Sequence, residues 1–143
     1  MMGTRIVIDT SVVVSALIGA QGPAREVLRQ GLEGRFVPLI STPLFQEYQS
    51  LVSRPDILAQ CPLQAGEIQT LMNAWYDCCQ WIRIYYLGRP NLPDEDDNFL
   101  FELAMAGNAE LILTQNLRDM APELAFPRIR VLTPARYLQE VST

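Results

Sequence analysis

The sequence contains no histidine and no lysine, and these two absences remove several kinds of chemistry. Without histidine the chain cannot build a Ser-His-Asp or Cys-His catalytic site, and it cannot bind a metal through imidazole. Without lysine it cannot use a P-loop, a Schiff base or a lysine-assisted phosphoryl-transfer site. Any enzymatic chemistry must therefore depend on carboxylates, hydroxyl groups, arginine or a hard cation.

Cysteine and long hydrophobic runs are also scarce. Cys61, Cys78 and Cys79 do not predict a disulfide framework or a zinc site, because two are adjacent and no histidine accompanies them. We interpret them as small hydrophobic side chains or incidental thiols. No apolar run approaches the ~20 residues that cross a bilayer, and the N-terminus leads into a strand-like segment rather than a signal peptide. We expect a soluble, cytoplasmic protein that does not bind membranes.

The length and charge set further bounds. A chain of 143 residues fits a single domain, residues 1–143, which buries about two-thirds of its unfolded surface. The formal charge of −5 argues against broad electrostatic adhesion to nucleic acid or to an anionic membrane. This charge does not exclude a local cluster of arginines at the rim of a site, or a basic protein partner.

The hydrophobic pattern predicts alternating strands and helices. Residues 5–9 form a β-branched run that suits a strand covered on both faces. Further strands are expected at 36–40, 81–86, 111–114 and 129–132. Helices are expected at 10–17, from Pro23 to Gly31 or Gly34, and from 41–43 to a point before Pro55. Three more are expected at 64–80, from the acids 94–97 to Gly107, and at 134–141. A loop is expected at 87–93 and a polar turn at 115–119. This order predicts a three-layer α/β/α domain with a mainly parallel central sheet.

The most unusual stretch is the run of four consecutive acids at 94–97, which leads directly into an apolar helical pattern. Such a run is either a solvated helix start or part of a metal site. The helical register behind the run singles out Asp97. Asp94, Glu95 and Asp96 fit charges and a cap at the helix start, and Asp94 and Asp96 are also candidates for auxiliary metal ligands.

Two further acids fall where a site could form. Asp9 closes a buried strand, and Glu47 is spaced with Leu44 and Leu51 so that it is predicted to interrupt the apolar face of its helix. The plain alternatives are that Asp9 caps the following helix and that Glu47 is a buried acid paired with an arginine. Sites in parallel α/β folds form beyond the carboxyl ends of strands, where the chain order reverses.

If strands 5–9 and 111–114 are neighbours, Asp9, Glu47 and Asp97 could converge, with Asn116 or Asp119 opposite them. Carboxylate oxygens are the ligands that Mg²⁺ and Mn²⁺ prefer. Such ions activate water and stabilise the leaving oxygen in phosphodiester cleavage. The pattern therefore indicates a magnesium or manganese site at this edge of the sheet.

An ordered set of motifs covers essentially the whole chain. Its members are Val7-Ile8-Asp9-Thr10-Ser11, Glu47-Tyr48 with residues 51–55, and residues 93–104, 111–119 and 131–138. With these motifs the sequence resembles PIN-domain ribonucleases, near the toxin components of toxin–antitoxin systems, and is similar in general plan to VapC toxins. The resemblance implies an RNA substrate, a cognate antitoxin protein as partner, and a homodimer formed through apolar helix faces.

The resemblance also implies roles for individual residues. Asp9, Glu47 and Asp97 would hold the divalent cation. Many PIN domains place a further aspartate two residues after the threonine that ends the fourth strand, where this sequence has Asn116. Asn116 could bind the cation or position water through its carbonyl, and Asp119 could supply the missing charge.

Three hypotheses follow. The first is a divalent-metal-dependent endoribonuclease. The second, motivated by Asn116 and the low positive charge, is a catalytically weak or inactive module that binds RNA or a protein. The third, a small-molecule phosphohydrolase, is weakened by the absence of lysine. We expect aromatic side chains in the core or in dimer contacts rather than stacked on bases, namely Trp75, Trp81, Tyr85 and Tyr86.

Overall fold

The computed structural model describes residues 3–19, 22–84, 95–117 and 128–142, and for residues 95–98 the backbone alone. Its centre is a sheet of five parallel strands in the order β3-β2-β1-β4-β5. The strands are β1 (Arg5–Ile8), β2 (Val37–Ile40), β3 (Gln80–Trp81), β4 (Leu111–Leu113) and β5 (Arg130–Leu132). The predicted parallel sheet is therefore confirmed.

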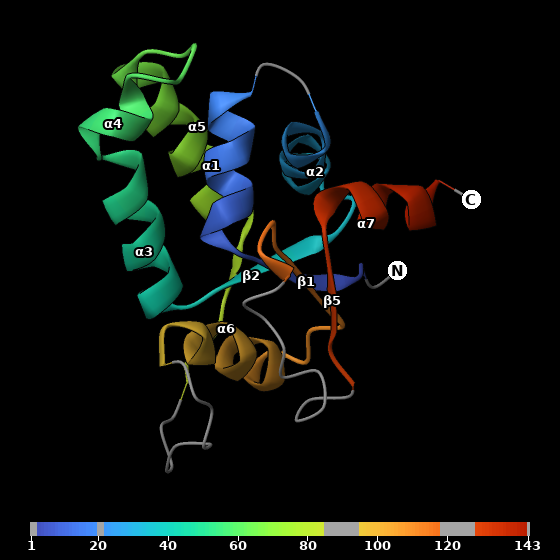
Figure 1. Ribbon diagram of the computed structural model, residues 1–143. Helices are drawn as coiled ribbons and strands as arrows, with labels where there is room; N and C mark the ends of the chain where they lie inside the picture. The colour runs from blue at the N-terminus through green and yellow to red at the C-terminus, as the bar shows by residue number, and fades with distance from the viewer. Residues whose placement is uncertain (1–2, 20–21, 85–94, 118–127, 143) are drawn as a thin grey trace.

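Helices cover both faces of the sheet. They are α1 (Thr10–Ile18), α2 (Pro23–Leu32), α3 (Thr42–Val52), α4 (Pro55–Leu58), α5 (Ala65–Cys78), α6 (Glu95–Ala106) and α7 (Pro134–Val141). Figure 1 shows α6 on one face, with α1, α2, α5 and α7 on the other, while α3 stands beside α1 and reaches α6 with its first turn. This arrangement confirms the three-layer α/β/α architecture.

The central strand forms where the sequence is most strongly β-branched. Ile6, Val7 and Ile8 are fully buried, because β1 lies between β2 and β4 and has helices on both faces. A strand covered on both faces needs an uninterrupted apolar run, which is the pattern that predicted it. In the described part of the chain, no helix has the length and apolar character needed to cross a membrane.

Two of the predicted helix starts have clear local causes. The hydroxyl of Ser41 accepts a hydrogen bond from the backbone N–H of Leu44 over 3.4 Å at the start of α3. The hydroxyl of Thr133 accepts one from Arg136 over 3.2 Å at the start of α7. In both helices a proline occupies the first turn, where its missing N–H has no cost.

Close approach of α2 to α5 depends on a glycine. A Cβ atom at Gly31 would lie 2.6 Å from Cζ3 of Trp75, whose side chain is completely buried. A larger residue at position 31 would push the two helices apart. The prediction that Trp75 belongs to the core is confirmed.

The structure differs from the sequence prediction at two elements. The third strand is only Gln80–Trp81, shorter than the predicted 81–86 and one residue earlier; residues 82–84 are not part of it. Residues 85–86 and the predicted loop 87–93 lie outside the described residues. The short helix Pro55–Leu58 was not predicted, because Pro55 was interpreted only as the end of the preceding helix, whereas it also begins a new one.

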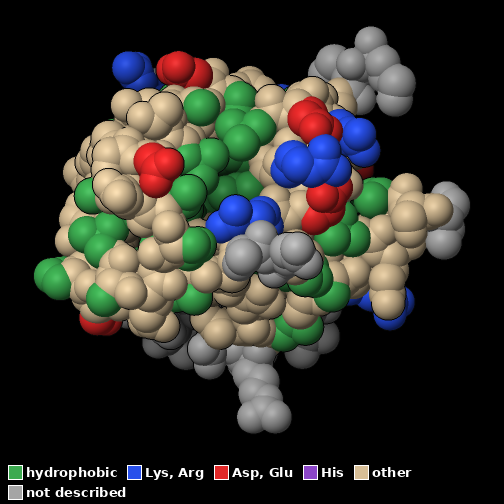
Figure 2. Space-filling model, turned by 90° about the horizontal axis from the view of Figure 1, so that it is seen from above, with side chains coloured by type: hydrophobic (Ala, Val, Ile, Leu, Met, Phe, Trp, Pro, Cys, Tyr) green, Lys and Arg blue, Asp and Glu red, His purple; other side chains and the backbone are tan. Residues whose placement is uncertain are grey.

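The surface opposite α6 carries mixed charges rather than a basic patch. Figure 2 shows acidic and basic side chains next to one another on this face, beside a hollow lined by hydrophobic side chains. On α2, Arg29 binds Glu26 and Glu33 at 2.7 Å and 2.6 Å. Such exposed pairs contribute little to stability, but they neutralise the arginine that they contain.

Candidate functional site

Polar residues gather at the carboxyl edge of the sheet. The residue that directly follows each of β1, β2, β4 and β5 is Asp9, Ser41, Thr114 or Thr133, in that order. Ser41 and Thr133 cap helices. The side chains of Asp9 and Thr114 cap none of the described helices and are therefore the candidates for a functional site. They follow β1 and β4, the two neighbouring strands at which the chain order across the sheet reverses.

The two strands that carry these residues are direct neighbours. Ile8 of β1 pairs with Leu113 of β4, and the backbone N–H of Asp9 donates to the carbonyl oxygen of Leu113 over 2.9 Å. The expectation that these strands are adjacent is therefore confirmed. Their junction is the switch point at which parallel α/β folds place their sites.

Three hydroxyl groups surround the Asp9 carboxylate. Oγ1 of Thr114 donates to Oδ2 over 2.6 Å, and Oγ of Ser11 donates to the same oxygen over 2.9 Å. Thr10 approaches the other oxygen, Oδ1, at 3.3 Å, which is long for a hydroxyl donor. The carboxylate is thus held firmly through Oδ2, while Oδ1 keeps most of its capacity to accept.

The loop that follows β4 fixes the direction of these bonds. Ser11 Oγ accepts from the backbone N–H of Gln115, and Thr114 Oγ1 accepts from that of Asn116, each over 3.0 Å. A hydroxyl has one hydrogen to give, so both hydroxyls use theirs on Asp9. Ser11 and Thr114 therefore connect the loop to the carboxylate, and the 3.3 Å between their oxygens is a contact only.

The alternative role for Asp9, a cap for the helix that follows it, does not fit the hydrogen bonds of its side chain. Asp9 occupies the N-cap position of α1, but its carboxylate accepts no capping hydrogen bond from the backbone of that helix. Within the described residues it also forms no ion pair with an arginine. Its carboxylate is instead partly exposed and oriented by hydroxyl groups.

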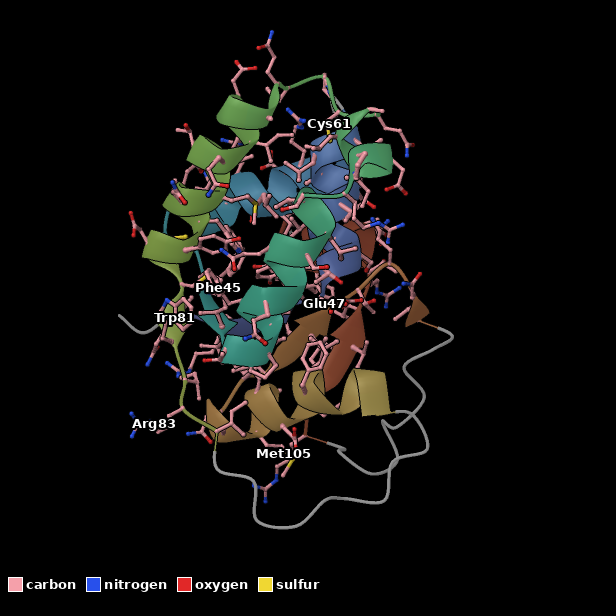
Figure 3. All side chains as sticks on the ribbon, turned by 90° about the vertical axis from the view of Figure 1, so that its left-hand side faces the viewer. Phe45, Glu47, Cys61, Trp81, Arg83 and Met105 are labelled. Atoms are coloured by element: carbon pink, nitrogen blue, oxygen red, sulfur yellow. The ribbon has the colours of Figure 1, made fainter. Side chains whose placement is uncertain are left out.

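Glu47 was predicted to interrupt the apolar face of its helix, and this prediction is wrong. The buried face of α3 consists of Leu44, Tyr48 and Val52, at intervals of four residues, and Leu51 is only partly buried. Glu47 is exposed, so the alternative of a buried acid paired with an arginine is also wrong. Figure 3 shows Glu47 on the side of α3 that faces α1.

Tyr48 ties this part of α3 to the site. Its hydroxyl donates to the carbonyl oxygen of Ile8 over 2.5 Å, one residue before Asp9. Burial raises the pKa of the Tyr48 hydroxyl well above its usual value, with smaller contributions from Cys79 and Asp9. The hydroxyl therefore stays protonated as a donor, and it holds the turn that carries Glu47 beside the end of β1.

The first turn of α6 lies toward the same edge of the sheet. At the other end of this helix, the Nε–H of Arg5 donates to the carbonyl oxygen of Gly107 over 2.5 Å, at the start of β1. Figure 1 shows α6 running back across the sheet against the direction of β1. The backbone of Asp97, in the first turn, is thus on the side where Asp9 lies.

Several predicted site residues fall outside the description. Asp94 and Asp119 lie outside the described residues, as does Arg118, and the side chains of Glu95, Asp96 and Asp97 are not described. Among the side chains that are described, no three histidine, cysteine, aspartate or glutamate residues form a cluster that could hold a metal. The convergence of Asp97 with Asp9 and Glu47 therefore stays a prediction.

Thr114 is the site residue that sequence reasoning missed. It was interpreted as the end of a strand, and the residues considered as functional side chains were Asn116 and Asp119 beyond it. A polar residue that closes a buried apolar run was the available signal, since Thr114 is completely buried and can satisfy its hydroxyl only at the strand end. Asn116 itself is exposed, and its backbone N–H is linked to the Asp9 carboxylate through the hydroxyl of Thr114.

Comparison with known proteins agrees with this architecture. The profile of a protein family described as "PIN domain" matches residues 5–118. Among solved structures, the chain resembles one described as VapBC2 from Rickettsia felis bound to a DNA fragment from their promoter, with a TM-score of 0.59 and 14% identity. That match covers 90% of this chain and 97% of the other. No curated protein sequence matches the chain.

Proposed function

Since the chain belongs to the PIN-domain family, we propose that it is a divalent-metal-dependent endoribonuclease and the toxin of a toxin–antitoxin pair. PIN domains are generally nucleases, which supports a hydrolytic role. The observation that carries the proposal is the Asp9 carboxylate at the switch point of the sheet, held by Ser11 and Thr114 through one oxygen. No cationic side chain in the described part of the chain neutralises it.

The donor groups near Asp9 fit a hard divalent cation. They are carboxylate and hydroxyl oxygens, and Oδ1 of Asp9 has only a long contact with Thr10. We assign Asp9, Glu47 and Asp97 as the residues that would hold Mg²⁺ or Mn²⁺. Asp94, Asp96 and Asp119 are further candidate metal ligands, because they lie near these residues or near Asn116 in the sequence.

A bound cation of this kind supplies an activated water and charge stabilisation at a phosphodiester. The protein groups around it have positioning roles. Ser11 and Thr114 use their hydrogens on Asp9, so they orient this carboxylate and are not nucleophiles. Asn116 would offer its side-chain carbonyl to a water molecule or to the cation, and Tyr48 keeps the Glu47 turn against β1.

The partners follow from the same family membership. One solved structure that the chain resembles is described as VapBC2 bound to a DNA fragment from their promoter. We propose that this chain binds a cognate antitoxin, and its net charge of −5 suits a partner segment rich in basic residues. A homodimer and a cytoplasmic location complete the proposal.

The test is a panel of single-stranded and structured RNAs, incubated with Mg²⁺, with Mn²⁺ or with a chelator. We expect cleavage only when metal is present. Asp9→Asn, Glu47→Gln and Asp97→Asn should each lose it, whereas Asp56→Asn should keep it, because Asp56 is an exposed acid on α4 that pairs with Arg54. Metal-independent cleavage, or cleavage that survives Asp9→Asn, would overturn the proposal.

The non-cleaving alternative has a separate signature. The neutral Asn116 favours it, because it leaves one carboxylate fewer than many PIN domains carry. Calorimetry with Mn²⁺ on the wild-type chain and on Asp9→Asn decides between the two. Binding that is lost in the variant supports the nuclease, while RNA binding with neither metal binding nor cleavage supports the inactive module. Hydrolysis of simple phosphate esters would instead indicate a phosphohydrolase.

A further inference from the structure

A small pocket opens beside the first turn of α3, at the same edge of the sheet as Asp9. It has a volume of about 360 Å³. Its walls are Ser41, Thr42 and Pro43 on one side and residues 81–84 on the other. The pocket therefore combines hydroxyl groups, an indole ring and a guanidinium group, and neither Asp9 nor Glu47 lines it.

The indole of Trp81 is exposed at this pocket rather than buried. Its exposed fraction is 49%, so of the two places expected for this residue the core is wrong, while a dimer contact stays a prediction. The ring is supported from behind by Phe45, with 5.2 Å between ring centroids, and Phe45 in turn packs edge-on against Tyr76 at 4.7 Å. Figure 3 shows Phe45 and Trp81 side by side. Such a ring is held in place while part of its surface remains free for another flat group.

Arg83 presents a positive charge on the same side of the segment. Side chains two residues apart in an extended segment point the same way, and Trp81 and Arg83 are exposed while Ile82 and Ile84 are partly buried. Unlike Arg29 or Arg54, Arg83 forms no ion pair with an acid in the described part of the chain. Figure 3 shows Trp81 and Arg83 along one edge of the molecule.

The register of the sheet places this pocket at a defined distance from Asp9. Val7 pairs with Leu39, and Leu39 pairs with Gln80, so Trp81 stands level with the residue before Asp9. Two strand spacings of ~4.8 Å separate their backbones, which is about 10 Å. That distance is on the order of a few nucleotides, since the axial rise of one strand in a DNA duplex is already ~3.4 Å per nucleotide. One short single strand can therefore contact both places.

We propose that Trp81 and Arg83 form a nucleotide-binding subsite, in which the indole stacks on an unpaired RNA base and the guanidinium binds a neighbouring phosphate. The inference rests on the proposed function, and it names the form of substrate, a single strand, and the residues that set its register. Stacking on an aromatic ring and pairing with arginine are the usual ways in which proteins hold single-stranded RNA. Arg83 supplies a local positive charge on a chain whose net charge is −5.

The test uses the full chain carrying Asp9→Asn, so that RNA is bound without being cut. The chain has two tryptophans, and Trp75 is completely buried, so quenching of tryptophan fluorescence by a single-stranded oligonucleotide reports on Trp81. A panel of fluorescein-labelled oligonucleotides with one abasic position each then gives affinities by anisotropy. We expect one abasic position, and not its neighbours, to weaken binding about tenfold to a hundredfold, the size of one base–aromatic stack.

Variants complete the experiment. In the Asp9→Asn chain, Trp81→Ala should weaken binding of the intact oligonucleotide by a similar factor and abolish the difference between abasic positions. Trp81→Phe should retain most of the affinity. Arg83→Ala should weaken binding to all oligonucleotides and reduce its salt dependence, whereas Arg54→Ala, a matched loss of charge on α4, should not. Circular dichroism of each variant reports whether it is folded.

Failure of this inference is distinguishable from failure of the proposed function. If the wild-type chain cuts RNA with metal but Trp81→Ala and Arg83→Ala bind and cut RNA as the wild type does, the subsite is wrong and the nuclease stands. The subsite is equally wrong if these variants keep their RNA affinity and instead lose a protein partner. If the wild-type chain neither binds nor cuts RNA, the proposed function fails, and the inference fails with it.

Discussion

Thr114 donates its hydroxyl hydrogen to Oδ2 of Asp9 over 2.6 Å, although 105 positions separate the two residues in the sequence. The same hydroxyl accepts from the backbone of Asn116. One buried side chain thus orients the carboxylate and shapes the loop beside it. Mutation of groups that orient metal ligands typically lowers metal affinity or activity by about tenfold to a hundredfold.

Thr114→Val should separate this orienting role from packing, because valine has almost the same shape. We expect affinity for Mn²⁺ and RNA cleavage to fall about tenfold to a hundredfold. The backbone N–H of Asn116 also loses its acceptor, which should lower the free energy of unfolding by ~1–3 kcal/mol. Calorimetry with Mn²⁺, cleavage assays and urea denaturation measure these effects.

The matched control is Thr114→Ser, which keeps the hydroxyl and loses only a methyl group. It should bind Mn²⁺ nearly as the wild type does. If the valine and serine variants lose metal affinity equally, the hydroxyl of Thr114 is not what orients Asp9.

Tyr48→Phe should show that the contribution of the Tyr48 hydroxyl to the free energy of unfolding depends on pH. Burial raises the pKa of Tyr48 in the folded chain above the value of ~10 expected when unfolded. A group of this kind contributes its full stabilisation below pH ~10, and this contribution is lost as the pH rises further, because the unfolded chain ionises first. The wild type should therefore exceed the variant by a constant ~1 kcal/mol at pH 7–9 and lose this advantage above pH 10.

Urea midpoints at several pH values measure this difference. Tyr76 and Tyr137 also have pKa values raised by burial, but both are present in the two proteins and cancel in the comparison. An advantage that stays constant up to pH 11 would contradict the assignment to Tyr48. Because the hydroxyl also holds the Glu47 turn, the variant should bind Mn²⁺ more weakly at neutral pH.

The sheet could be predicted from sequence because its central strand is a single β-branched run, and such a run has few alternatives. Asp9 was identified for the same reason, since it is the first polar residue after that run. The partnership of Asp9 with Thr114 could not be predicted, because it depends on which strands are neighbours. That order is decided by packing between segments more than a hundred residues apart.

The two errors on side-chain burial have a common physical cause. Glu47 and Trp81 were placed by hydrophobic pattern alone, Glu47 in an apolar face and Trp81 in the core or in a dimer contact. The rotation of α3 is set instead by Tyr48, whose hydroxyl donates to the carbonyl of Ile8, and Glu47 is therefore exposed beside the buried face rather than within it. Trp81 lies on the edge strand, where a large aromatic ring is covered on one side only. Composition does not distinguish an edge strand from a central one.

Gly31→Ala tests the close approach of α2 and α5. The new Cβ atom would lie 2.6 Å from Trp75, which is completely buried, and 3.0 Å from Phe36. Overpacking of this kind costs ~1–3 kcal/mol, more than the gain of up to ~1 kcal/mol from replacing a helical glycine. We expect a lower melting temperature. Gly66→Ala in α5 is the control, since nothing lies within 4 Å of its Cβ position, and it should be neutral or stabilising.

Asn116→Asp tests whether the fourth acid of many PIN domains is what this chain lacks. The residue is exposed, and its backbone is bound to Thr114, so a carboxylate there would be oriented by the same loop that meets Asp9. An added carboxylate should tighten Mn²⁺ binding by about tenfold, or ~1.4 kcal/mol, and raise the cleavage rate. Gln115→Glu adds the same charge one residue earlier and serves as the control for long-range electrostatics. If both variants tighten binding equally, the gain is a property of net charge, whereas a gain confined to position 116 assigns this residue to the site.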